Sequence, residues 1–225
     1  MRLIPSLRKF ALATLFISPC LGEAALVINN ITPSTQNFAA SLSGPTAEIF
    51  FSPFEDRQFA FSFTTGLDTV TVTDFTFSIS LGDAILSPIQ ITLSTGTVVP
   101  GGTGGITLGT VAPLSPTPVG QLLTVTPTST VTLTPSTNYW IHLTVPSGGG
   151  VYSVNNSNNP ILAPGWSLGN SWYYEPDFGG SWTEITSGPQ ARVNLNVQSV
   201  PEPTTVVLGA VSALLLCTRR RRFTA

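Results

Sequence analysis

The chain has 225 residues, which is enough for one sizeable β domain with short appendages. Only 9% of the residues are charged and 42% are hydrophobic, and this combination argues against a disordered chain. Residues 25–199 hold two arginines and nine carboxylates, a net charge of −7, which argues against nucleic acid and disfavours anionic lipid as a partner of this part.

Residues 1–24 have the three parts of a secretory signal peptide. A positive n-region is followed by an apolar run and by small residues at the −3 and −1 positions of a cleavage site. These parts are, in order, Arg2, Arg8 and Lys9, then residues 10–17, then Gly22 and Ala24. We therefore expect a signal helix that directs export. The alternatives are a short core helix and a lipoprotein signal at Cys20, which the preceding Pro19 fits poorly.

Period-two alternation of apolar and polar residues recurs from about residue 26 to residue 197. One face of each segment is apolar and the other carries hydroxyl or amide groups, which is typical of antiparallel strands with one buried face. The clearest segments are residues 59–63, 75–81, 89–93, 139–145 and 193–197.

Turn-forming Gly, Pro and Ser residues separate these segments. About ten strands at this spacing predict an all-β fold, an antiparallel two-sheet β-sandwich of jelly-roll type over residues 25–199. Val70 and Val72 have the opposite phase to Phe75 and Phe77, so we expect a bulge or turn near Asp74. The Gly- and Pro-rich residues 99–105 predict a long hairpin loop.

The residues that usually carry catalysis are scarce. Cys20 and Cys217 lie in the end segments, so the domain has no disulfide or thiolate site. The only histidine, His142, shares a strand face with Trp140 and Thr144, and no G-x-S-x-G motif accompanies it. We interpret His142 as a surface strand residue.

Carboxylates leave two alternatives open, an acid pair for glycoside hydrolysis and a calcium ion held by scattered acids. The acids concerned are Glu175, Asp177 and Glu184 for the first, and Glu48, Asp56 and Asp83 for the second. Acids at strand ends are common, and no calcium-loop motif is present. We therefore expect no enzyme activity, no catalytic residue, no cofactor and no metal.

Aromatic residues are concentrated between positions 166 and 182. Such rings stack on pyranose faces in sugar-binding sandwiches. The candidate ligand-binding residues are Trp166, Trp172, Tyr174 and Trp182. An exposed coplanar row of rings would favour carbohydrate binding, whereas rings that cap the end of the sandwich would be structural, which is the interpretation we prefer.

The last 26 residues combine three features in a fixed order. They are Val200, Pro201, Glu202 and Pro203, then the apolar residues 204–218, then Arg219, Arg220, Arg221 and Arg222. As a helix the apolar part would reach about 22 Å, short of the ~30 Å hydrocarbon core, so it would span only with local thinning and arginine snorkelling. The arginines would stay on the cytoplasmic side.

This order of features resembles the PEP-CTERM sorting signal of bacteria that produce exopolysaccharide. Such tails are substrates of an exosortase, a membrane enzyme expected to cut near the Pro-Glu-Pro. The resemblance implies an exosortase-type partner and a precursor held in the inner membrane by residues 200–225. The final location would be the cell surface or the extracellular matrix. A plain tail anchor is the alternative.

Four short strings inside the domain resemble the choice-of-anchor domains, and most closely the R type. The strings are residues 61–66, 133–141, 165–166 and 180–182. These families are extracellular β domains found with alternative C-terminal anchors. The resemblance brings no activity and no functional residues with it.

Together these features predict an exported, exosortase-sorted β-sandwich protein with a structural or adhesive role. The alternative is a carbohydrate-binding module that uses the aromatic cluster at residues 166–182, with extracellular polysaccharide as its partner.

Overall fold

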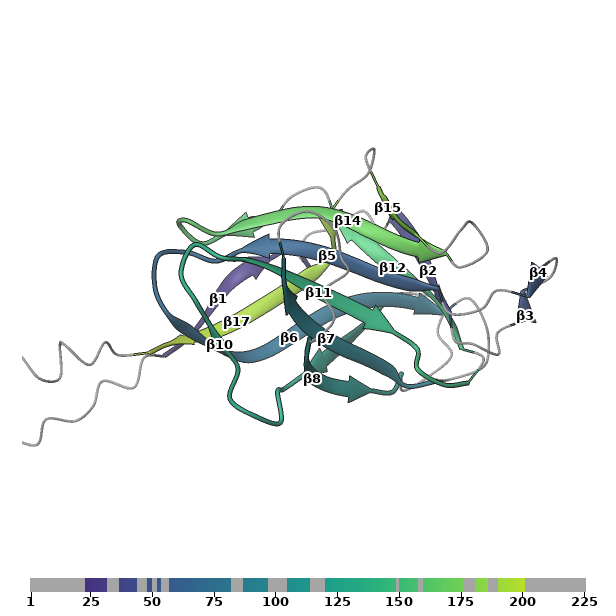
Figure 1. Cartoon of the computed structure of the whole chain (residues 1–225), viewed down its shortest axis with the longest axis horizontal. Coiled ribbons are helices and arrows are strands. Elements are labelled where there is room, and N and C mark those ends of the chain that lie inside the picture. The colour runs from purple at the N-terminus through teal and green to yellow at the C-terminus, as the bar shows by residue number, and fades with distance from the viewer. Residues whose placement is uncertain are drawn as a thin grey trace, which may run out of the picture. The chain divides into compact units, whose positions relative to one another are not determined.

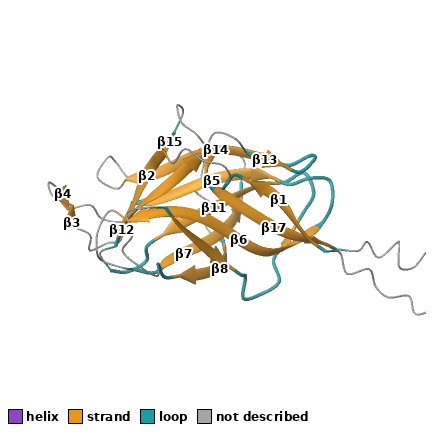
Figure 2. Ribbon diagram, turned by 180° about the vertical axis from the view of Figure 1, so that it is seen from behind, coloured by secondary structure: helices purple, strands orange, loops and turns teal. Residues whose placement is uncertain are grey.

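The described part of the chain is built from strands and loops, with no helix (Figures 1 and 2). The computed structural model describes residues 23–31, 37–43, 48–49, 52–53, 57–81, 87–96, 105–113, 120–148, 150–157, 160–175, 181–185 and 190–200. The predicted all-β class is confirmed for these residues. None of their segments is a helix long and apolar enough to cross a membrane.

Within the described residues, two antiparallel sheets contain nearly all of the strands. The nine-stranded sheet consists of β1 (Ala24–Asn29), β2 (Asn37–Ser43), β6 (Val70–Leu81), β9 (Gln121–Val125), β10 (Thr132–Leu133), β12 (Val151–Ser157), β13 (Ile161–Leu162), β16 (Gln190–Ala191) and β17 (Val193–Ser199). The six-stranded sheet consists of β5 (Gln58–Thr64), β7 (Ile89–Thr95), β8 (Ile106–Val111), β11 (Asn138–Thr144), β14 (Ser167–Glu175) and β15 (Ser181–Glu184). A separate small hairpin joins β3 (Glu48–Ile49) to β4 (Ser52–Pro53).

The strand order follows hydrogen bonding rather than sequence. The larger sheet runs β13-β1-β17-β6-β12-β16, with β9 and β10 also paired to β6 and β2 to β12. The smaller sheet runs β15-β14-β5-β11-β7-β8. Strands far apart in the chain are therefore neighbours, as β5, β11 and β7 are in Figure 1.

The two sheets share one hydrophobic core, so the fold is β-sandwich-like. The inward residues of β5 are Phe59, Phe61 and Phe63, each at most 1% exposed. Phe61 stacks on Phe75 of β6 in the other sheet, with ring centroids 5.9 Å apart. Each such ring contributes about 1.5–3 kcal/mol by leaving water, which explains why the alternating segments locate the core.

The phase change along β6 is a β-bulge, as predicted. Val72 pairs with Val197, whereas Asp74 pairs with Asn196, so Thr73 is the extra residue on β6. The bulge lets the apolar side chains on both sides of it point toward the core. Val70 and Val72 before it and Phe75 and Phe77 after it are all buried. β7 and β8, which flank the predicted hairpin loop at residues 99–105, pair antiparallel, whereas residues 97–104 lie outside the described residues.

Three of the strings used for the choice-of-anchor resemblance, residues 61–66, 133–141 and 165–166, are joined by structural contacts. Thr65 Oγ1 donates to the Thr134 carbonyl at 2.6 Å, and the Ser136 amide donates to the Gly66 carbonyl at 2.8 Å. A Cβ on Gly66 would come within 2.7 Å of the Trp166 indole nitrogen. These contacts fasten the loop after β5 to the turn before β11.

Residues 1–22 and 201–225 lie outside the described residues. The predicted signal helix, the predicted C-terminal helix and the sorting residues Pro201 to Arg222 fall there. The described strands belong to one unit, Gly22–Glu202.

Candidate functional site

Of the four aromatic residues predicted as a ligand platform, Trp166 lies apart from Trp172 and Trp182. Trp166 stacks on Phe63 with ring centroids 6.2 Å apart and packs against the core. Trp166 therefore supports the core. Trp172 on β14 and Trp182 on β15 lie instead on the outer face of the six-stranded sheet, where both are half-buried.

Tyr174 is opposite both Trp182 and Gln58 in the strand register, and its side chain lies outside the described residues.

Strand register places a row of residues across this outer face. His142 on β11 is opposite Ala60 on β5 and Thr92 on β7. Ala60 is in turn opposite Trp172, which is opposite Glu184 on β15. The small side chain of Ala60 leaves room for the larger rings on either side.

The rings on this face meet edge to face. Trp140 and Trp172 have centroids 6.1 Å apart at 83°, and His142 and Trp182 have centroids 5.7 Å apart at 74°. Within each of these two pairs the rings are therefore not coplanar. They form an outer aromatic cluster of Trp140, His142, Trp172 and Trp182, which lies on the opposite side of the sheet from the core.

Trp140 shows how closely this cluster packs. It is only 3% exposed although it points away from the core. Its Nε1 is buried and has no hydrogen-bond partner among the described residues. Gly96, the residue after β7, lies beside the indole, since a Cβ there would be 3.7 Å from Cδ1.

His142 lies on the outer face, as its strand phase predicts, but it is nearly buried, at 9% exposure. Its Nε2 is 2.8 Å from the Ser94 hydroxyl on β7. Burial lowers the pKa of His142 below its usual 6.5 because the charged ring would lose its hydration. The ring is therefore neutral at pH 7, with one donor and one acceptor nitrogen.

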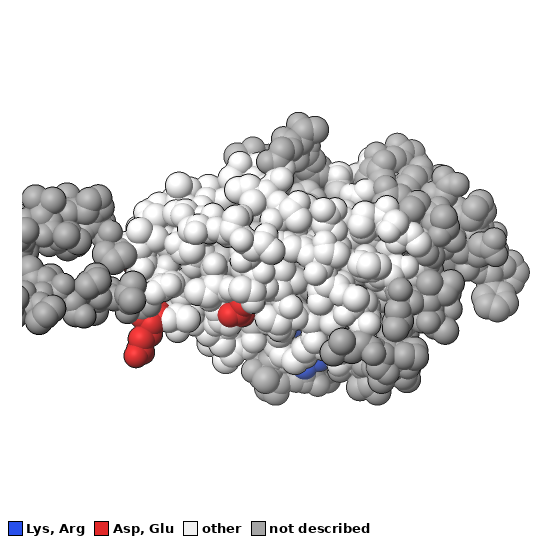
Figure 3. Space-filling model, turned by 90° about the horizontal axis from the view of Figure 1, so that it is seen from below, with Lys and Arg blue, Asp and Glu red and all other residues white. Residues whose placement is uncertain are grey.

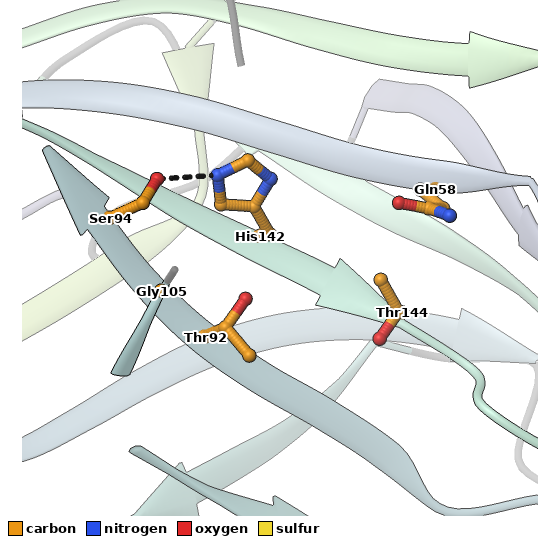
Figure 4. Close-up of a pocket in the computed structure, with 6 residues that line it drawn as sticks. All are labelled: Gln58, Thr92, Ser94, Gly105, His142 and Thr144. Carbon is orange, nitrogen blue, oxygen red and sulfur yellow. Dashed lines mark hydrogen bonds between the residues drawn. The ribbon is translucent and has the colours of Figure 1, made fainter. Parts of the chain in front are cut away.

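A groove of about 130 Å³ opens beside His142 on this face (Figure 4). Its lining comes from four elements of the sheet: Gln58 of β5, Thr92 and Ser94 of β7, His142 and Thr144 of β11, and Gly105 just before β8. These residues are polar or glycine, and none is ionised at pH 7. The groove can therefore offer several hydrogen bonds but no charge.

The sequence did not indicate that four of the lining residues form one set of possible ligand contacts. These residues are Gln58, Thr92, Ser94 and Thr144. Their signal was present, because each occupies the polar phase of an alternating strand. That phase gives the face of a residue, but it does not say which strands are neighbours. Only the pairing of β5 with β11 and of β11 with β7 brings them together.

Of the carboxylates considered for catalysis or calcium, the structure describes only the side chain of Glu184. The described residues contain no group of three or more His, Cys, Asp or Glu that could hold a metal ion. Glu184 accepts a hydrogen bond from the Asn170 side chain. The side chains of the other five candidates, Glu48, Asp56, Asp83, Glu175 and Asp177, lie outside the described residues.

Comparison with models of known protein families finds no match to the chain, and comparison with curated proteins finds no significant match either.

Proposed function

We propose that the chain is an exported protein of the cell surface or extracellular matrix, sorted by an exosortase-type enzyme. Its jelly-roll-like β-sandwich serves a structural or adhesive role without catalysis. The proposal rests on two parts of the sequence. They are the signal-like N-terminus and the three C-terminal features that follow one another from Val200 to Arg222.

One structural relationship supports it. Ala24 at the start of β1 is opposite Gln198 near the end of β17, and the strands are antiparallel. The chain therefore enters and leaves the sandwich at one end. A membrane-held precursor attached there would keep the opposite end and both outer faces free for contacts.

The positions of the first and last strands fit the same proposal. The first strand begins at Ala24, where the signal peptide is predicted to end, and the last ends at Ser199, directly before the Val-Pro-Glu-Pro. Cleavage at either point would leave nearly all of the pairing between β1 and β17 intact. Processing at both ends is thus compatible with the folded domain.

The chemistry of the protein surface also suits a structural or adhesive role. On the face seen in Figure 3, charged side chains are sparse among the described residues. The outward positions carry hydroxyl and amide groups, such as Thr76, Thr124 and Asn196. Such a surface can contact a hydrated neutral polymer without paying to desolvate ions.

Expression of the full chain in an exopolysaccharide-producing host with and without its exosortase tests this proposal. With the enzyme we expect a shortened form at the surface or in the medium, and without it a full-length form in the inner membrane. Glu202→Ala should behave like loss of the enzyme, and Glu184→Ala should not. The same fractionation in both hosts would contradict exosortase sorting.

A second candidate function is carbohydrate binding. It is favoured by one observation, the uncharged groove at His142 with Trp182 packed against that histidine. This function is compatible with the first, because an adhesive matrix protein needs a partner to adhere to.

A further inference from the structure

We propose that the groove at His142 binds the edge of a neutral, hydroxyl-rich saccharide chain, with Trp182 as the neighbouring aromatic contact. This inference rests on the second candidate function, and it names the site and the class of ligand.

The chemistry of the lining selects for hydroxyl groups. Thr92, Ser94 and Thr144 carry hydroxyls, and Gln58 carries an amide, so several donors and acceptors lie within a small area. Sugar hydroxyls are themselves both donors and acceptors. An anionic ligand would lose its hydration here without meeting a cation, because no lysine or arginine lines the groove.

His142 adds a polar contact that needs no charge. Its Nε2 is engaged by Ser94, while the other ring nitrogen points toward the side of the groove where Gln58 lies (Figure 4). Because burial lowers its pKa, the ring stays neutral at pH 7 and that nitrogen can serve a neutral hydroxyl as donor or acceptor.

The groove lies on regularly paired strands. Gln58, His142 and Thr92 lie on β5, β11 and β7, three neighbouring strands with six paired positions on each side of β11. A site on paired strands loses little conformational freedom on binding. At its β8 side the groove is bounded by Gly105, where a Cβ would lie 3.1 Å from the Leu93 carbonyl oxygen.

The size of the groove indicates how the ligand would lie. Its volume of about 130 Å³ is below the ~300–1,000 Å³ of sites that enclose a small molecule. The ligand would thus be partly inserted, with the rest of the chain over the outer aromatic cluster. The half-buried Trp182 packs edge to face on His142, where its ring can meet the apolar side of a sugar. This favours a polysaccharide over a free monosaccharide.

The test uses the full-length chain in a zwitterionic detergent that has no sugar headgroup. Hexasaccharides of glucose, mannose, galactose and xylose are titrated by calorimetry and by tryptophan fluorescence, with oligogalacturonate as the anionic probe. We expect at least one neutral probe to bind, and oligogalacturonate to bind at least about ten-fold more weakly, a difference of ~1.4 kcal/mol.

Two variants locate the site. Thr92→Val keeps the shape and removes one hydroxyl, and should weaken binding about two- to twelve-fold, as expected for one neutral hydrogen bond. Trp182→Ala should weaken it by more than about ten-fold, as expected for a buried aromatic contact. Thr132→Val, at an exposed threonine of β10 in the other sheet, is the matched control and should bind as the wild type does.

Each failure has a separate meaning. If no probe, neutral or anionic, binds up to about 10 mM, a Kd near the weak limit of specific recognition, both the carbohydrate function and the site are wrong. If a neutral probe binds with equal affinity to wild type, Thr92→Val and Trp182→Ala, the function stands and the site is wrong. Binding of the anionic probe alone would overturn the ligand class. Because Thr92→Val is close to isosteric, it remains informative even if Trp182→Ala fails to fold.

Discussion

The hydroxyl of Tyr152 forms two hydrogen bonds with the backbone of Ser87, which lies 65 residues earlier in the chain. It accepts from the Ser87 N–H and donates to the Ser87 carbonyl, both at 2.6 Å. Tyr152 is on β12 of the larger sheet, and Ser87 comes just before β7 of the smaller one. This one side chain therefore ties the two sheets together at a fully buried point.

Replacing Tyr152 with Phe should lower the free energy of unfolding by about 2–4 kcal/mol, because it leaves a buried N–H and a buried carbonyl without partners. Urea denaturation of the full chain measures the change. Tyr139→Phe is the matched control. It loses contacts to Thr134, which is exposed, so water can replace them and the cost should be smaller. Equal losses in both variants would contradict the special role of Tyr152.

Ser136 has a φ of 49°, in the left-handed region that glycine adopts without strain. Ser136→Gly should therefore raise the free energy of unfolding by about 0.5 kcal/mol, and the backbone hydrogen bond from residue 136 to the Gly66 carbonyl is kept. Ser147, also exposed in a turn, has an ordinary φ, so Ser147→Gly should lower stability by about 0.5–1 kcal/mol. Opposite signs in a urea titration check the argument, and a loss in both variants would count against it.

Ser171 points inward on β14, opposite Phe61, and is 3% exposed. Its hydroxyl is buried without a hydrogen-bond partner in the described part of the chain. Ser171→Ala should therefore stabilise the fold by about 1 kcal/mol, since it removes a hydroxyl that loses its water on folding and gains no hydrogen bond in return. Ser80→Ala, which loses a hydrogen bond of 3.2 Å to Asn155, should destabilise it by a similar amount. Thermal unfolding of both variants distinguishes the two effects, and a destabilised Ser171→Ala would show that the hydroxyl has a partner.

The strands and the core were predictable from the sequence because each depends on local alternation. The residues on either side of the β6 bulge change phase within six positions, and one extra residue reconciles this change with a single buried face. Strand neighbours depend on contacts between distant segments, which local alternation does not encode. For the same reason the groove, built from β5, β7 and β11, could not be assembled in advance.

The aromatic cluster shows the same limit. Trp166 and Trp172 are six positions apart, yet they lie on opposite sides of the six-stranded sheet, because Trp166 precedes β14 and a register shift lies between Leu168 and Ser171. Trp140 joins Trp172 on the outer face although 32 positions separate them. Clustering in sequence was therefore a poor guide to clustering in space.

His142 makes the stability of the fold depend on pH. Its pKa is lowered by burial, so between that value and 6.5 the unfolded chain binds a proton that the folded chain does not. The free energy of unfolding should be constant just above pH 6.5 and should fall below it, by at most about 1.4 kcal/mol per pH unit. His142 is the only histidine in the chain, and ordinary carboxylates titrate at lower pH.

His142→Gln should remove this slope between pH 6.5 and about 5, because glutamine keeps hydrogen-bonding groups but does not titrate. Urea titrations of both proteins at half-unit steps from pH 8 to pH 5 measure the difference. The two curves should run parallel above pH 6.5 and converge below it as the wild type loses stability. If the wild type and the variant lose stability equally across this window, the proton is taken up elsewhere. His142 would then be accessible enough to titrate normally in the folded state, and its ring would be charged whenever the groove is exposed to mildly acidic surroundings.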